Sequence, residues 1–279
     1  KIAFEKCNPE FVFHMAAQPL VLKSYKNPEE TFDINFKGTL NLLEILKEFN
    51  QKVQAVFITT DKVYENLELG VPFVETDNLG GKDPYSASKA ASEILINSYS
   101  QSFFRDSNIS IATARAGNVI GGGDWSENRL IPDIIKAAQD NSPVIIRNPK
   151  AIRPWQHVLE PLFGYLMLGI GLFNNPNKYL GSWNFGPDDD DLKSVEDIIN
   201  IGKKSEVVGE AIYEKLTFEE ANNLILNIDK AKLKLNFKPV WNSEKAVKIT
   251  FEWYKKFYEN AFATNKLIES DLERYLNKQ

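Results

Sequence analysis

The 279-residue sequence has few of the residues that build disulfide or metal sites, with one cysteine and two histidines. Because Cys7 is alone, it cannot form an internal disulfide, which fits a reducing compartment such as the cytoplasm. A structural zinc site needs about four Cys or His ligands, so no metal centre of that kind is expected. The sequence therefore predicts a cytoplasmic protein that folds without covalent or metal cross-links.

Long apolar runs and basic clusters are also missing. The longest apolar stretch, 162–173, is broken by three glycines. It is shorter than the roughly 20 residues that cross a bilayer. The 38 acidic residues outnumber the 33 basic ones, which are interspersed among them, and the net charge is −5. We therefore expect neither a membrane nor a nucleic acid as a partner.

Strands and helices alternate in the first half of the chain. The apolar runs 11–14, 53–59 and 109–114 are typical of strands buried on both faces. Helical patterns at 28–47 and 84–104 lie between them. This alternation predicts an α/β fold with a Rossmann-like, doubly wound parallel sheet, in which ligands bind beyond the carboxyl ends of the strands.

The pattern changes after Gly121. Short strands are predicted at 144–147 and 182–185, among loops rich in Gly, Pro, Asn and Asp, and amphipathic helices near 194–205, 229–235 and 243–260. We predict a domain at 1–121 that carries the catalytic residues. A smaller α/β lobe at 122–279 would mainly bind substrate, with short segments returning to the sheet.

Tyr85 and Lys89 start the second predicted helix and lie one turn apart on one face. An ammonium close to a phenol lowers the pKa of that phenol, so Tyr85 is a candidate general base. The alternative is a pair of exposed residues, since this spacing is common on helices.

Thr60, Asp61 and Lys62 follow a predicted strand and therefore stand at its carboxyl end. A hydroxyl, a carboxylate and an ammonium in sequence form a compact polar cluster at the expected ligand site. The alternative is a simple turn, capped by Asp61 and with Lys62 in solvent.

Several segments together resemble the extended short-chain dehydrogenase/reductase superfamily, namely 14–18, 35–39, 60–62, 84–89 and 115–119. Longer stretches resemble the CDP-glucose 4,6-dehydratase branch of that superfamily, namely 13–21, 61–66, 117–125 and 152–161. This resemblance implies an NAD-dependent lyase that dehydrates CDP-glucose in deoxysugar biosynthesis, such as that of lipopolysaccharide O-antigen.

The resemblance also implies roles for the catalytic residues. Tyr85 would take the proton of the sugar 4-hydroxyl, Thr60 would bond to the 4-oxygen, and Lys89 would bind the nicotinamide ribose. Lys62 would remove the C5 proton and Asp61 would protonate the departing 6-hydroxyl. A lysine base must be neutral in a useful fraction of molecules, which requires burial or a nearby cation.

By this resemblance, a lysine at position 62 favours CDP-glucose as the substrate over dTDP-glucose. Relatives that act on dTDP-glucose normally carry glutamate there, and 4-epimerases generally lack the Asp-Lys pair. Epimerisation, or dehydration of another nucleotide sugar, is the enzymatic alternative.

Further residues are carried over from the resemblance alone. The cofactor-binding set adds Ala16, Ala17, Asn35 and Thr59 to Tyr85 and Lys89. The expected contacts to the substrate come from Gln18, Asn118, Arg129, Leu130, Arg153 and Asn184. Arg147 competes with Arg153 for the diphosphate, the alanines could be core instead, and Trp155 and Trp183 are expected to be core.

A glycine-rich turn of the Rossmann type is missing before residue 11. We expect about two strand-helix units, on the order of 60 residues, to be absent. Either the sequence is part of a longer enzyme, or it is a truncated, inactive binding or assembly fragment. The resemblance implies a homodimer through helices 28–47 and 84–104, which a fragment could keep.

Overall fold

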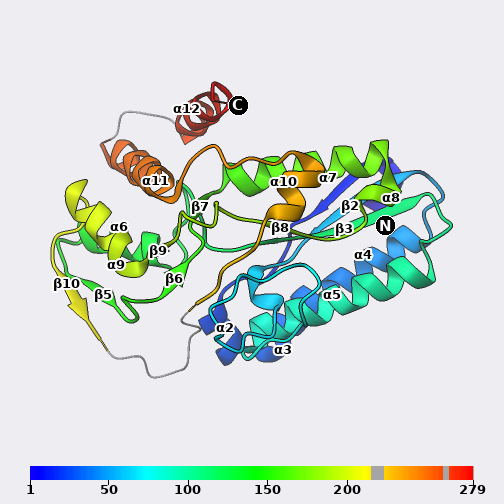
Figure 1. Cartoon of the computed structure of the whole chain (residues 1–279), viewed down its shortest axis with the longest axis horizontal. Coiled ribbons are helices and arrows are strands. Elements are labelled where there is room, and N and C mark those ends of the chain that lie inside the picture. The colour runs from blue at the N-terminus through cyan, green and yellow to red at the C-terminus, as the bar shows by residue number, and fades with distance from the viewer. Residues whose placement is uncertain (215–222, 260–263, 279) are drawn as a thin grey trace.

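The computed structural model describes residues 1–214, 223–259 and 264–278, and its centre is a parallel sheet of four strands. The strand order is β1-β2-β3-β8 (Figure 1). The strands are Phe11–His14, Val53–Ile58, Ile109–Ala116 and Gly181–Phe185. All four strands were predicted, and with the helices they form a Rossmann-like α/β fold. β8 pairs with β3 although it lies far beyond residue 121, so the chain returns to the sheet.

Helices cover both faces of the sheet (Figure 1). α4 (Gly38–Lys47) and α5 (Pro84–Ser102) pack on one face, where Val53, Ala55 and Phe57 of β2 join the same apolar core. α7 (Leu159–Asn174) covers the other face, which receives Val56. Because successive residues of a strand point to opposite faces, burial on both faces explains why β2 reads as one continuous apolar run.

The predicted helix 28–47 is one helical stretch with a change of pitch. It consists of α3 (Pro28–Phe32), the π-helical segment η1 (Asp33–Lys37) and α4. The change falls at buried Asn35, whose carbonyl accepts hydrogen bonds from the hydroxyls of Thr39 (2.7 Å) and Ser92 (3.2 Å). Side-chain donors at a helix carbonyl favour such local widening.

Among the described residues, the second lobe contains three pairs of short strands, covered by helices. β5 (Val144–Ile146) pairs with β10 (Ala211–Tyr213), β4 (Val119–Ile120) with β7 (Gln156–His157), and β6 (Ile152–Arg153) with β9 (Lys193–Ser194). The helices α6 (Leu130–Gln139), α9 (Val195–Lys204) and α11 (Ser243–Tyr258) enclose an apolar core that includes Trp155. The expected core positions of Trp155 and Trp183 are confirmed.

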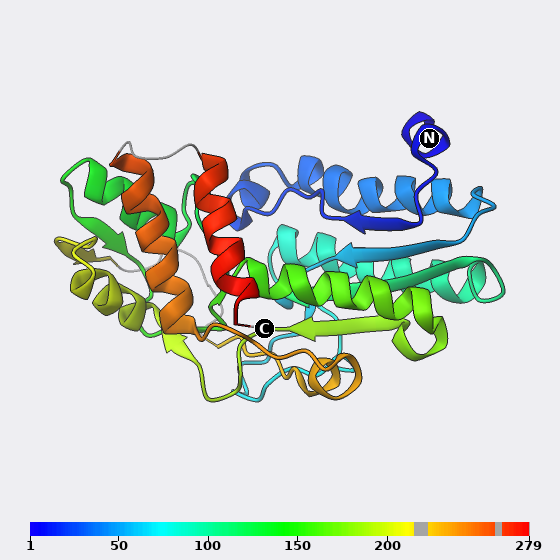
Figure 2. The same cartoon turned by 90° about the horizontal axis from the view of Figure 1, so that it is seen from above.

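The remaining elements are short or peripheral. They are α1 (Ile2–Cys7), α2 (Val21–Lys26), η2 (Asp61–Val63), α8 (Pro176–Tyr179), α10 (Asp229–Leu235) and α12 (Thr264–Leu276). The helices predicted near 194–205, 229–235 and 243–260 correspond to α9, α10 and α11, although residue 260 lies outside the described residues. Within the described ranges, no helix has the length and apolar character needed to span a bilayer. The strands of the sheet point towards the second lobe (Figure 2).

Candidate active site

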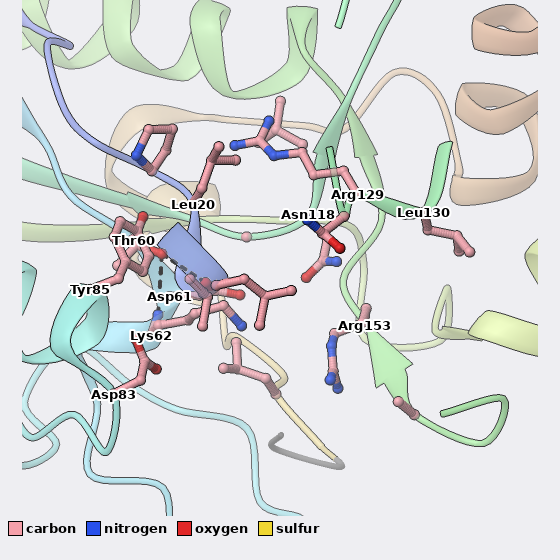
Figure 3. A pocket seen from close by; sticks show the side chains of 18 of the residues that line it. Leu20, Thr60, Asp61, Lys62, Asp83, Tyr85, Asn118, Arg129, Leu130 and Arg153 are labelled. Atoms are coloured by element: carbon pink, nitrogen blue, oxygen red, sulfur yellow. Dashed lines mark hydrogen bonds between the residues drawn. The ribbon is translucent and has the colours of Figure 1, made fainter. Parts of the chain in front are cut away.

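A cavity of about 1280 Å³ lies between the carboxyl ends of the strands and the second lobe (Figure 3). Both parts of the chain supply its walls. The predicted site residues that line it are Thr59, Thr60, Asp61, Lys62, Tyr85, Asn118, Arg129, Leu130 and Arg153. The expected convergence of the 60–62 cluster with Tyr85 is therefore observed, although the two are distant in sequence.

Thr60, Asp61 and Lys62 leave the end of β2 and enter the 3-10 turn η2. The Thr60 hydroxyl donates to Asp61 Oδ1 (3.0 Å) and accepts from the backbone N–H of Lys62 (3.4 Å). Thr60 and Asp61 are buried, whereas Lys62 is half-buried. The turn thus fixes the hydroxyl and the carboxyl at the cavity wall and leaves the lysine stem more freedom.

The carboxyl of Asp61 is an unusual group for a protein interior. Burial raises its pKa, although the nearby charges of Lys62 and Arg153 act in the opposite direction. In the part of the chain that the structure describes, Asp61 Oδ2 is buried without a hydrogen-bond partner. It faces Gly117, where any side chain would overlap the carboxylate. Such an acid retains its proton more readily than an exposed aspartate and can donate it to a ligand.

Tyr85 lies in the first turn of α5, which Asp83 caps by accepting from the backbone N–H of Ser86 (3.0 Å). The phenol is buried and lies close enough to Thr60 for that hydroxyl to act on its pKa. Burial raises the pKa of Tyr85 to about 12, against the lowering effect of Thr60. Thr60 and Tyr85 lie next to each other at the cavity wall (Figure 3), so both can bond to the same substrate oxygen.

Lys89 corrects one expectation from the sequence. Its Nζ donates to the carbonyl of Ile58 (3.0 Å) rather than to the phenol of Tyr85. Burial lowers the pKa of Lys89 to about 8. The pKa of Tyr85 is raised, not lowered, because desolvation outweighs the groups that stabilise the phenolate.

Of the residues expected to hold a dinucleotide, Thr59 and Tyr85 line the cavity, whereas Ala16, Ala17, Asn35 and Lys89 are not among its lining residues. Ala16 and Ala17 follow the end of β1 and expose small side chains, which lets a flat ring approach the backbone. Lys89 has three N–H donors, of which the Ile58 carbonyl takes one. These features and Thr59 fit NAD. The buried amide of Asn35 bonds to Gln18 and Ser88 instead of facing a cofactor. Asn35 therefore supports the loop that carries the two alanines.

Gln18 and Asn184 do not line the cavity, and their amides serve the fold. Gln18 bonds to the backbone of Leu20 and to the Thr31 hydroxyl. Asn184 donates to two carbonyls, accepts from the hydroxyl of Tyr64 (2.6 Å) and is fully buried. Both amides are therefore engaged within the chain itself, and their expected contacts with substrate stay predictions.

Arginines dominate the wall on the side of the second lobe. Arg129 pairs with Asp124 (2.9 Å), and Arg147 bonds to Asn128 (2.9 Å). The buried Arg153 lies close enough to Asp61 to lower the pKa of that carboxyl. Guanidinium groups around an open cavity suit a diphosphate, because each can bond to two oxygens. Sequence reasoning had no means of finding Asp124 as the partner of Arg129.

The sequence matches known families over most of its length. The family model described as GDP-mannose 4,6 dehydratase matches residues 1–168. A CDP-glucose 4,6-dehydratase of Salmonella typhimurium is 44% identical over 256 residues, which are 88% of this chain and 71% of the relative. A UDP-glucose 4-epimerase of Mycoplasma pneumoniae is 30% identical, over 90% of this chain and 78% of the relative.

Solved structures share the fold. A UDP-glucose 4-epimerase from Thermotoga maritima, with UDP-glucose, aligns with a TM-score of 0.80 at 22% identity, covering 92% of this chain and 81% of the other. A dTDP-glucose 4,6-dehydratase from Bacillus anthracis, in complex with NAD, gives a TM-score of 0.76 at 19% identity, covering 93% and 76%. The chain thus belongs to the nucleotide-sugar 4,6-dehydratase family that the GDP-mannose 4,6-dehydratase model describes, within the extended short-chain dehydrogenases and reductases.

Proposed function

We propose that the protein is an NAD-dependent CDP-glucose 4,6-dehydratase, which converts CDP-glucose to CDP-4-keto-6-deoxyglucose and water. The observation that carries this proposal is the contact between Thr60 and Tyr85 at one cavity wall, with Asp61 and Lys62 beside them. The sequence relationship to a CDP-glucose 4,6-dehydratase supports the choice of substrate.

The oxidation step uses Tyr85 and Thr60. NAD would supply the hydride acceptor for oxidation at C4 and the hydride donor for reduction at C6. Tyr85 takes the proton of the 4-hydroxyl, and Thr60 bonds to the same oxygen, where charge changes during the reaction. In the chain alone, burial raises the pKa of Tyr85 to about 12, which favours the protonated phenol. Positive charge brought close to the phenol would lower this pKa and make the proton transfer easier.

The elimination step uses the two neighbouring residues. A ketone at C4 acidifies the C5 hydrogen, which Lys62 removes while the C6–O bond breaks. Asp61 donates a proton to the departing hydroxyl, so that water leaves. Burial raises the pKa of Asp61 and so favours the protonated form that this role needs.

A panel of nucleotide sugars tests the substrate. The holoenzyme is incubated with CDP-glucose, dTDP-glucose and UDP-glucose, and the alkaline absorbance of a 4-keto-6-deoxy product is followed. We expect turnover of CDP-glucose to exceed that of the other two by at least an order of magnitude, as buried polar groups in a base pocket can provide. Turnover confined to dTDP-glucose, or formation of a 4-epimer, would rule the assignment out.

We also propose a cytoplasmic homodimer formed through residues 28–47 and 84–104. Two apolar residues of the segment 84–104 are well exposed in the single chain, Ile94 at 60% and Phe103 at 50%. Ile94→Lys should shift the mass in solution from two chains to one, whereas Leu233→Lys, at an exposed site on α10, should not. The exposed thiol of Cys7 suits the cytoplasm.

A further inference from the structure

A buried ion pair lies behind the catalytic wall. Glu93 of α5 and Arg115 of β3 are each 3% exposed, and Arg115 Nε donates to Glu93 Oε1 (2.9 Å) while Nη2 donates to Oε2 (2.9 Å). Burial alone would raise the pKa of Glu93, but Arg115 and the hydroxyls of Thr59 and Thr113 hold it below its usual range. Glu93 is not among the residues that line the cavity.

The pair holds the catalytic turn at both ends. Glu93 Oε1 accepts from the hydroxyl of Thr59 (2.5 Å), the residue before Thr60. Arg115 Nη1 donates to the hydroxyl of Tyr64 (2.8 Å), the second residue after Lys62. The segment that contains the three catalytic residues is thus attached on both sides to one carboxylate-guanidinium unit.

The same helix contacts three consecutive residues at the end of β2. Tyr85 lies against Thr60, Lys89 donates to the carbonyl of Ile58 (3.0 Å), and Glu93 accepts from Thr59. The three helical residues are each four positions apart, so they lie on one face of α5. Glu93 is the acidic member of this series and is itself fixed by Arg115.

We propose that Glu93 is a positioning residue: with Arg115 as its counter-ion, it holds Thr59 and thereby sets the separation between Thr60 and Tyr85. This inference rests on the proposed function, because its effect is measured in the oxidation that those two residues perform. A displacement of about 1 Å in such a site can reduce the rate on the order of 10²-fold.

The chain contains a matched pair of substitutions that separates positioning from stability. Thr59 and Thr113 are both buried, and both donate a hydroxyl to Glu93, at 2.5 Å and 2.8 Å. Thr59 precedes the catalytic turn, whereas Thr113 lies within β3 and away from the cavity. Replacement by valine keeps the shape of each side chain and removes one hydrogen bond from the same carboxylate.

The experiment measures kcat, KM, bound NAD and Tm for Thr59→Val, Thr113→Val, Glu93→Gln and the double variant Thr59→Val/Glu93→Gln. We expect Thr59→Val and Glu93→Gln to lower kcat, expressed per bound NAD, by more than tenfold, with KM within twofold. Thr113→Val should keep kcat within twofold although its Tm falls as much as that of Thr59→Val. The double variant should be no slower than the slower single variant, because both changes break the same link.

Equal losses of kcat in Thr59→Val and Thr113→Val, or losses that multiply in the double variant, would overturn the proposal. If Glu93→Gln does not fold, the comparison of Thr59→Val with Thr113→Val still tests the proposal. All rates are measured on whichever sugar of the panel the wild type converts, so a failure on CDP-glucose counts against the substrate alone. Crystal structures supply a readout without substrate: the separation of Thr60 and Tyr85 should widen in Thr59→Val and not in Thr113→Val.

Discussion

The two walls of the cavity differ in how firmly their polar groups are held. On the sheet side, Thr60, Asp61 and Tyr85 are at most 7% exposed and stand on a long strand and helix. On the lobe side, the side chain of Arg129 is 39% exposed, and its partner Asp124 is 29% exposed. The contrast indicates that the catalytic side chains are held in fixed positions, whereas the arginine expected to bind the diphosphate can change its conformation. Changes on the sheet side should therefore lower kcat, and changes on the lobe side should raise KM.

The sharpest test of the sheet side is Tyr85→Phe. The substitution keeps the buried ring and removes the phenol, so kcat should fall roughly 10³-fold, as expected for the loss of a general base. NAD reduction after mixing with substrate should disappear, while Tm stays within a few degrees of the wild type. Activity at the wild-type level would remove Tyr85 from the mechanism.

Lys62→Met separates the two chemical steps at the same wall. Without the amine, the C5 proton should stay in place and turnover should fall roughly 10²- to 10³-fold, while oxidation at C4 still occurs. Exchange of the C5 hydrogen with deuterated solvent, followed by mass spectrometry, measures this step. Normal exchange in the variant would contradict the role of Lys62 as the base.

Gly117→Ala tests whether the acid must be held in place. The added methyl group would overlap the Asp61 carboxylate, so we expect kcat to fall on the order of 10²-fold with little change in KM. Gly209→Ala is the control, because a methyl group there would meet open space. Equal activity of the two variants would show that the position of Asp61 is not critical.

Arg129→Gln tests the lobe side of the comparison. Loss of one charged contact to the diphosphate should raise KM about tenfold and leave kcat within about twofold. Lys248→Gln breaks an exposed ion pair with Glu244 on α11 and should change neither constant. If Arg129→Gln lowered kcat by a larger factor than it raised KM, the proposed difference between the two walls would be wrong. Arg153 is less suited to this test, because it is buried and also acts on Asp61.

The smallest expected effect concerns stability at low pH. Burial lowers the pKa of His157 to about 4, so its contribution is complete above the ordinary pKa of 6.5 and is lost as the pH falls towards 4. At pH 5 this loss is about 2 kcal/mol for one such histidine. His157→Phe keeps the ring that contacts Trp241 and should reduce the fall in Tm between pH 7 and pH 5. An unchanged fall would assign the pH dependence to other groups.

The strands and main helices could be predicted because their apolar periodicity follows directly from burial. The motif match also placed Thr60, Asp61, Lys62 and Tyr85, since residues at the ends of parallel strands share one edge of the sheet. Amides were the weak point, because a sequence does not reveal whether Gln18 faces a ligand or its own backbone.

The bond from Lys89 to Ile58 was missed for a similar reason. A lysine stem reaches several partners, and tertiary packing selects one of them. The pairing of Glu93 with Arg115 was also missed, although a signal exists. Both are charged residues within or directly after segments that the sequence predicts as a long helix and a buried strand, and buried charges need a partner.

The most direct test of the central claim follows deuterium from C4 of the sugar. The holoenzyme is incubated with CDP-glucose labelled with deuterium at C4, and the product is analysed by NMR. We predict that the label appears in the C6 methyl group of a 4-keto-6-deoxy sugar and that C5 carries hydrogen from solvent. Label retained at C4 in an epimer, with no ketone formed, would contradict the account.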